Sequence, residues 1–235
     1  MAAHFTPETM RFLRGLAKNN DRTWFEERRP VYERSVKAPM LAVVEEINVA
    51  LDDFAPEHVR PPHKVAMRIF RDTRFSPDKR PYKAHVSAWW ARRGLEKTDG
   101  AGFYLQIGPV SSFVSAGLYV PEREGLLAVR RWLAEHHERY RDVLAPLLKA
   151  KGKRTAMEPI DPNALTRNPK GFPPEHPASD LVRARNWGVS LPLAAESTLS
   201  ETLAHEVADT LRRTAPLVDL LNEAFQTTRT PAIFR

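Results

Sequence analysis

Hydrophobic positions recur with a helical period over residues 1–55, which predicts a group of N-terminal helices. The first helix begins at Thr6-Pro7, because threonine is a preferred N-cap and proline is favoured at the first helical position. We expect this helix to end near Lys18, where Asn19-Asn20-Asp21 forms a turn and caps the next helix. The apolar face of that next helix carries Trp24-Phe25, which we interpret as core anchors.

The pattern then changes from helical to alternating, which indicates β-strands within residues 64–119. The short connections favour antiparallel neighbours, because parallel strands would need crossovers of about a dozen residues or more. The strands expected in this part of the chain cover residues 64–70, 84–92, 102–107 and 112–119.

Helical periodicity returns after the strands and predicts a long helix over residues 122–149. The following segment, residues 150–180, contains many prolines and is expected to be irregular. Residues 185–225 are expected to form one more strand and a final amphipathic helix, capped by Ser197 or Ser200. The order of helices, strands and helices predicts an α+β fold.

We expect one domain over residues 1–235, in which an antiparallel sheet of four to six strands packs with N-terminal, central and C-terminal helices. The hydrophobic fraction of 42% and the charged fraction of 28% are typical of a soluble globular protein. The chain lacks cysteine, which excludes disulfides, thiolate metal sites and cysteine nucleophiles. The chain contains neither a leader pattern at its start nor an apolar run near the ~20 residues that span a bilayer, so we expect a cytoplasmic protein without a membrane segment.

The net charge of +7 is concentrated in one block of the sequence. Residues 61–100 carry ten Lys and Arg against four Asp and Glu, an excess of +6, whereas residues 1–60 carry nine against ten. Within the block, residues 68–83 contain six cations and two aspartates, a local charge of +4. A concentration of one sign attracts an anionic partner more strongly than a scattered surplus.

These observations make residues 68–83 the candidate site for a small ligand that bears phosphate or carboxylate. Guanidinium groups bind such oxyanions in pairs, lysine adds a point charge, and the prolines of the segment restrict its backbone. The candidate ligand-binding residues are Arg68, Arg71, Asp72, Arg74, Ser76, Asp78, Lys79, Tyr82 and Lys83, together with the distant Lys170 and His176. His85 and His176 are candidate general bases, because each is close to charged loop residues.

Four ordered motifs make the chain resemble the DUF2461 family of bacterial and fungal proteins. The motifs cover residues 16–25 (LAKNNDRTWF), 71–83, 117–119 (GLY), and 168–172 (NPKGF) followed by His176-Pro177. The resemblance extends over most of the chain and implies an α+β fold. It supplies no activity, catalytic residue or cofactor, so the candidate site depends on physical chemistry alone.

Two other interpretations of the basic segment stay open at this point. In the first, the protein is a structural or partner-binding one without a ligand, and the segment ties the sheet together: Asp72 and Asp78 cap turns and pair with arginines, while Phe75 and Tyr82 pack inward. In the second, it binds nucleic acid, although the chain contains no helix-turn-helix or zinc-finger pattern. The stacking platforms of this interpretation are Phe75, Tyr82, Trp89 and Trp90. The sequence contains no nucleophile elbow and no phosphate loop, and it predicts neither a metal nor a cofactor. It leaves open whether the protein is an enzyme and what its oligomeric state is.

Overall fold

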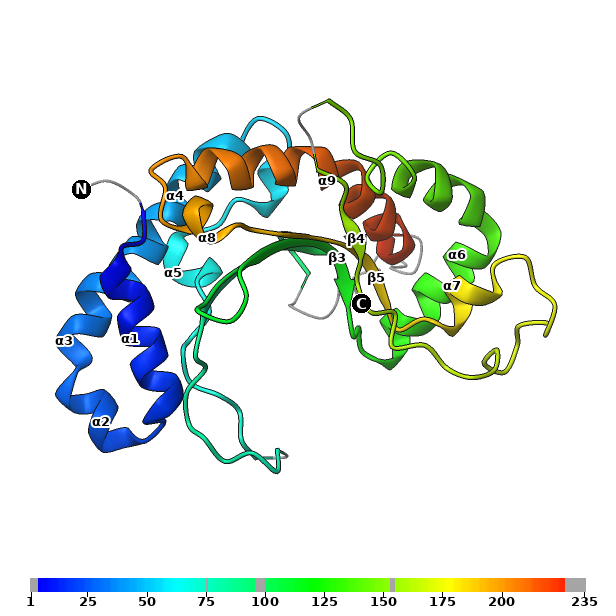
Figure 1. Cartoon of the computed structure of the whole chain (residues 1–235). Coiled ribbons are helices and arrows are strands. Elements are labelled where there is room, and N and C mark those ends of the chain that lie inside the picture. The colour runs from blue at the N-terminus through cyan, green and yellow to red at the C-terminus, as the bar shows by residue number, and fades with distance from the viewer. Residues whose placement is uncertain (1–3, 75, 96–99, 153–154, 227–235) are drawn as a thin grey trace, which may run out of the picture. The chain divides into compact units, whose positions relative to one another are not determined.

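The structure is a computed structural model that describes residues 4–74, 76–95, 100–152 and 155–226. Its five strands form one antiparallel sheet in the order β1-β2-β3-β5-β4, which confirms the predicted α+β class (Figure 1). The strands are β1 (Val86–Ala91), β2 (Gly102–Ile107), β3 (Phe113–Tyr119), β4 (Glu158–Pro159) and β5 (Asn186–Pro192).

The contacts within the chain define two compact units, which we describe separately. Unit 1 comprises residues 1–90, 104–114 and 192–210, and unit 2 comprises residues 91–103, 115–191 and 211–235. The single domain expected from the sequence therefore stays a prediction.

The N-terminal helices of unit 1 follow the helical pattern of the sequence. They are α1 (Pro7–Lys18), α2 (Arg22–Glu27), α3 (Arg29–Tyr32), a π-helical turn (Glu33–Lys37) and α4 (Ala38–Leu51). Thr6 is the N-cap of α1 and Asp21 is the N-cap of α2, where its carboxylate accepts a hydrogen bond from the Trp24 backbone N–H at 2.9 Å. Both caps agree with the sequence, because short oxygen-bearing side chains satisfy the free N–H groups of a first helical turn.

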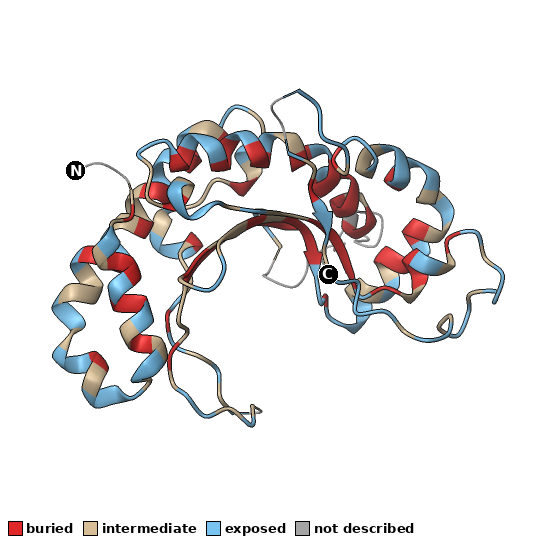
Figure 2. Ribbon diagram, viewed as in Figure 1, coloured by how far each residue is buried: buried red, intermediate tan, exposed pale blue. Residues whose placement is uncertain are grey.

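Aromatic side chains fill the space between these helices. Phe25 is fully buried, and its ring lies 5.1 Å from that of Tyr32 and 6.2 Å from that of Phe12. Figure 2 shows that the buried positions of α1 alternate with exposed ones, as an amphipathic helix requires. Phe25 is therefore the core anchor that the sequence predicted.

The strand expected over residues 64–70 was predicted incorrectly at its start. Pro62–Val65 forms a short helix, α5, because a proline at the first helical position favours the helical turn. After it the chain forms two isolated bridges, one from Ala66 to Ala88 in β1 and one from Phe70 to Tyr82 in the segment before β1. β1, β2 and β3 lie within two residues of their predicted bounds, whereas β4 was not predicted and lies in the segment that was expected to be irregular.

Unit 2 contains the whole of α6 and the short helix α7, with β4 paired antiparallel to β5. The helix α6 (Arg123–Leu144) ends earlier than predicted, and α7 covers Ser179–Arg183. Gly117 has a φ of +142°, and a Cβ added there would lie 2.1 Å from the Trp187 carbonyl oxygen, so only glycine fits this position of β3.

The last helices of the chain are α8 (Ala195–Thr198) and α9 (Leu203–Gln226). Neither Ser197 nor Ser200 directly precedes α9, although the Ser200 hydroxyl accepts a hydrogen bond from the Thr202 backbone N–H at 3.1 Å. No helix within the described part of the chain is both long enough and apolar enough to cross a membrane.

Candidate functional site

The basic segment forms an extended two-stranded ribbon in unit 1, which we call the basic arm (residues 66–74 and 76–85). The Arg71 backbone N–H donates to the Pro81 carbonyl at 2.9 Å, and the Lys83 backbone N–H donates to the Ile69 carbonyl at 2.8 Å. These bonds set the two sides of the arm antiparallel and place residues 72–74 and 76–80 at its tip. Phe75 lies outside the described residues.

The arm is attached to the N-terminal helices through Tyr82. The Asn20 side-chain amide donates from Nδ2 to the Tyr82 carbonyl at 3.0 Å and accepts from the Tyr82 backbone N–H at 2.9 Å. The rings of Tyr82 and Phe25 are stacked, with their centroids 4.3 Å apart, and Tyr82 is only 2% exposed. Tyr82 therefore has the inward-packing role of the structural interpretation.

Asp78 holds two arginines at the tip of the arm. Its Oδ2 accepts from Arg71 Nη1 at 2.5 Å and from Arg80 Nη2 at 2.7 Å, and Arg80 Nε lies 3.0 Å from Oδ1. Hydrogen bonds from Arg80, then from Arg71, keep the pKa of Asp78 well below its ordinary value. Asp78 therefore remains a carboxylate that fixes both guanidinium groups.

A second ion pair lies in the same arm. Arg74 donates from Nε and Nη2 to the two carboxylate oxygens of Asp72, at 3.0 and 2.7 Å, which lowers the pKa of Asp72 to about 2. Lys79 donates from Nζ to the Thr73 carbonyl at 3.0 Å. The Arg74–Asp72 and Arg80–Asp78 pairs are largely solvent-exposed, so they contribute little to global stability but restrict the directions of the side chains.

The remaining candidate residues of the arm differ in exposure. Arg68 is exposed, and Ser76 and Lys83 are partly exposed. His85 is half-buried, and this burial, followed by the positive charge of Lys83, lowers the pKa of its imidazole. The structure thus brings the candidates between Arg68 and His85 into one ribbon of unit 1.

Lys170 and His176 belong to unit 2. Lys170 is exposed, and His176 Nδ1 accepts a hydrogen bond from the Ala178 backbone N–H at 3.0 Å. Nearby, the Asn168 side chain donates to the Pro173 carbonyl at 2.6 Å. These contacts give the 168–177 motif a local turn-forming role, and the participation of Lys170 and His176 in the site stays a prediction.

Two residues outside the candidate set, Asn20 and Phe25, position the arm. Both residues belong to the LAKNNDRTWF motif of the sequence. From the sequence alone, this motif predicts a helix cap and a core anchor but no contact with the arm.

Among the described residues, no group of three or more His, Asp or Glu side chains is spaced to hold a metal ion.

Comparison with protein families gives a match over most of the chain. Residues 8–220 match the family described as conserved hypothetical protein (DUF2461), which confirms the resemblance seen in the four motifs. Comparison with curated proteins and with solved structures gave no match. The chain therefore belongs to the DUF2461 family.

Proposed function

We propose that this protein binds a small anionic ligand, bearing phosphate or carboxylate, through the basic arm. The observation that supports this function is the Arg71–Asp78–Arg80 cluster, in which one carboxylate fixes two guanidinium groups. The cluster keeps a net positive charge, and the arm as a whole has six cations for two aspartates between Arg68 and Lys83.

The two arginines keep hydrogen-bond donors for a ligand. Within the described part of the chain, Nε and Nη2 of Arg71 and Nη1 of Arg80 make no hydrogen bond. Because Asp78 already restricts the side chains, an oxyanion that binds these donors loses less conformational entropy on binding. Arg68 and Lys79 add charge to the same ribbon.

Titration with inorganic phosphate by calorimetry at low ionic strength tests the proposal. We expect Arg71→Gln and Arg80→Gln each to weaken phosphate binding by about three- to ten-fold, while Arg93→Gln, an exposed arginine outside the arm, changes it less than two-fold. The same weakening in all three variants would show that net charge alone attracts phosphate and would reject the arm as a site.

Thermal unfolding separates this function from a purely structural arm. A binding arm tolerates Arg71→Ala and Lys79→Ala with little change in melting temperature, because the Arg71–Asp78 pair is only partly buried and Lys79 is exposed. A large loss of melting temperature without any phosphate binding by the parent protein would favour the structural interpretation.

The nucleic-acid interpretation lacks an observation that favours it. Tyr82 and Trp90, two of its proposed stacking platforms, are 2% and 0% exposed and offer no free ring face. Binding of DNA or RNA by the parent protein that falls steeply with added salt, and that is absent in the arm variants, would support the nucleic-acid interpretation.

A further inference from the structure

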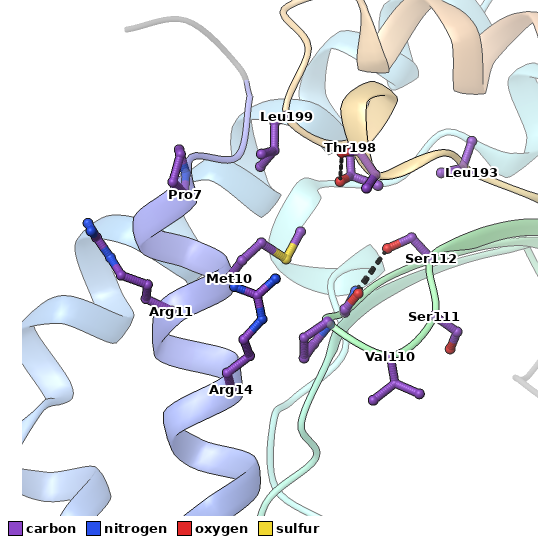
Figure 3. A pocket seen from close by; sticks show the side chains of 13 residues that line it. Pro7, Met10, Arg11, Arg14, Val110, Ser111, Ser112, Leu193, Thr198 and Leu199 are labelled. Atoms are coloured by element: carbon purple, nitrogen blue, oxygen red, sulfur yellow. Dashed lines mark hydrogen bonds between the residues drawn. The ribbon is translucent and has the colours of Figure 1, made fainter.

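A pocket of about 290 Å³ lies in unit 1, apart from the residues assigned to the basic arm (Figure 3). Its walls are α1, the hairpin between β2 and β3, and the segment that follows β5. Small-molecule sites commonly begin near ~300 Å³, so this volume suits a small ligand.

Most of the side chains around this pocket are apolar. Met10, Leu193 and Leu199 line it, together with Pro7 and Pro109. Val110, at the tip of the hairpin, also lines it and is 93% exposed, the largest exposure among the large hydrophobic residues described. An apolar ligand group would remove part of this surface from water, which favours binding.

Arg14 supplies the cationic group of the pocket. Figure 3 shows its guanidinium beside Met10, facing the hairpin, whereas the Arg11 side chain extends away on the other side of α1. Within the described part of the chain, Arg14 has no ion pair. The acidic residue in the first turn of α1, Glu8, already contacts Ser35 and Arg34.

The hydroxyl groups at the pocket are engaged within the protein. Ser112 Oγ accepts from the Gly108 backbone N–H at 3.1 Å and lies 3.2 Å from the Gly108 carbonyl, and Thr198 Oγ1 donates to the Ala195 carbonyl at 2.7 Å. The Ser112 bonds close the hairpin, and the Leu193 backbone N–H donates to the Ser112 carbonyl at 2.9 Å. Two walls are therefore connected before any ligand arrives.

We propose that this pocket binds an amphipathic carboxylate, with the carboxylate on Arg14 and a short apolar chain against Met10, Leu193 and Val110. The guanidinium recognises the carboxylate by charge-assisted hydrogen bonds, and the apolar walls select a ligand with a hydrocarbon tail. This site differs from the basic arm, whose proposed ligands need no apolar part.

Calorimetric titration of the parent protein with octanoate, acetate and the neutral amphiphile octanol tests the site. We expect octanoate to bind at least ten-fold more tightly than acetate, because acetate lacks the tail, and more tightly than octanol, because octanol lacks the charge. Arg14→Gln should weaken octanoate binding by about ten-fold, and Val110→Ser by about three-fold. Val110 is so exposed that its substitution leaves the fold intact.

Lys18→Gln is the matched control, since Lys18 is an exposed cation on the same helix and does not line the pocket. We expect less than a two-fold effect from it and from Arg71→Gln in the arm. Absence of octanoate binding, equal affinities for octanoate and acetate, or equal losses in Arg14→Gln and Lys18→Gln would each overturn the proposal. Loss of phosphate binding in Arg71→Gln with unchanged octanoate binding would support two separate sites.

Discussion

The side-chain amide of Asn20 makes two hydrogen bonds with the backbone of Tyr82, 62 positions later in the chain, at 3.0 and 2.9 Å. An amide offers a donor and an acceptor side by side, so it pairs with a backbone residue as a neighbouring strand would. The contact joins the LAKNNDRTWF motif to the basic arm, two segments that supported the family resemblance. We infer that the two motifs form one structural unit around Phe25 and Tyr82.

Replacing Asn20 therefore should weaken the attachment of the arm. We expect Asn20→Ala to lower the free energy of unfolding by about 1–3 kcal/mol, because it leaves the Tyr82 backbone groups without their partner in a partly buried place. Urea denaturation measures this change. Asn19→Ala is the control, since the Asn19 side chain donates to the Gly15 carbonyl of the adjoining helix α1 at an exposed position, and it should cost less. Equal costs for the two variants would contradict the attachment role.

Asp78→Asn distinguishes positioning from net charge in the arm. The substitution raises the charge of the arm by one but removes the carboxylate that fixes Arg71 and Arg80. If fixed guanidinium groups recognise the anion, phosphate binding should weaken by about three-fold despite the added charge. Calorimetry at two salt concentrations measures the effect. Tighter binding by Asp78→Asn would show that the arm attracts anions by charge alone.

We expect His85 to make the stability of the protein depend on pH. Burial, followed by Lys83, lowers the pKa of His85 in the folded state below its ordinary value of 6.5. The unfolded chain therefore binds a proton more readily as the pH falls through 6.5, so the contribution of this residue to stability is complete above that pH and decreases below it. We expect His85→Gln to flatten the decline of melting temperature between pH 8 and pH 5.

His63→Gln provides the comparison for this measurement, because His63 is exposed and belongs to the same region of the sequence. It should leave the slope of melting temperature against pH unchanged. A slope that responds equally to both substitutions would mean that burial of His85 has no special effect.

Local pattern predicted much of the fold because caps and periodicities act over a few residues. The start of α1 at Thr6-Pro7, the capping role of Asp21 and the bounds of β2 all agree with the sequence. The error at residues 64–70 arose where the arm pairs by isolated bridges, since alternation alone does not distinguish a regular strand from an irregular ribbon.

The candidate site was predictable only in part. The sequence located the charge excess and suggested that Asp72 and Asp78 pair with arginines, as the structure shows. It did not predict that Asn20 and Phe25 fix the arm, because a turn motif carries no information about a backbone partner 62 positions away. The cation and apolar side chains of the pocket come from three segments with no common pattern.

By itself the sequence determined the α+β class, the family, the first helices and the concentration of positive charge between Arg68 and Lys83, because composition and short-range spacing decide these properties. Only the tertiary structure decided which arginines share Asp78, that Tyr82 is buried against Phe25, and that Arg14 lies beside Met10 in a pocket. These arrangements depend on distances between segments that are remote in the chain, and packing determines such distances when the chain folds.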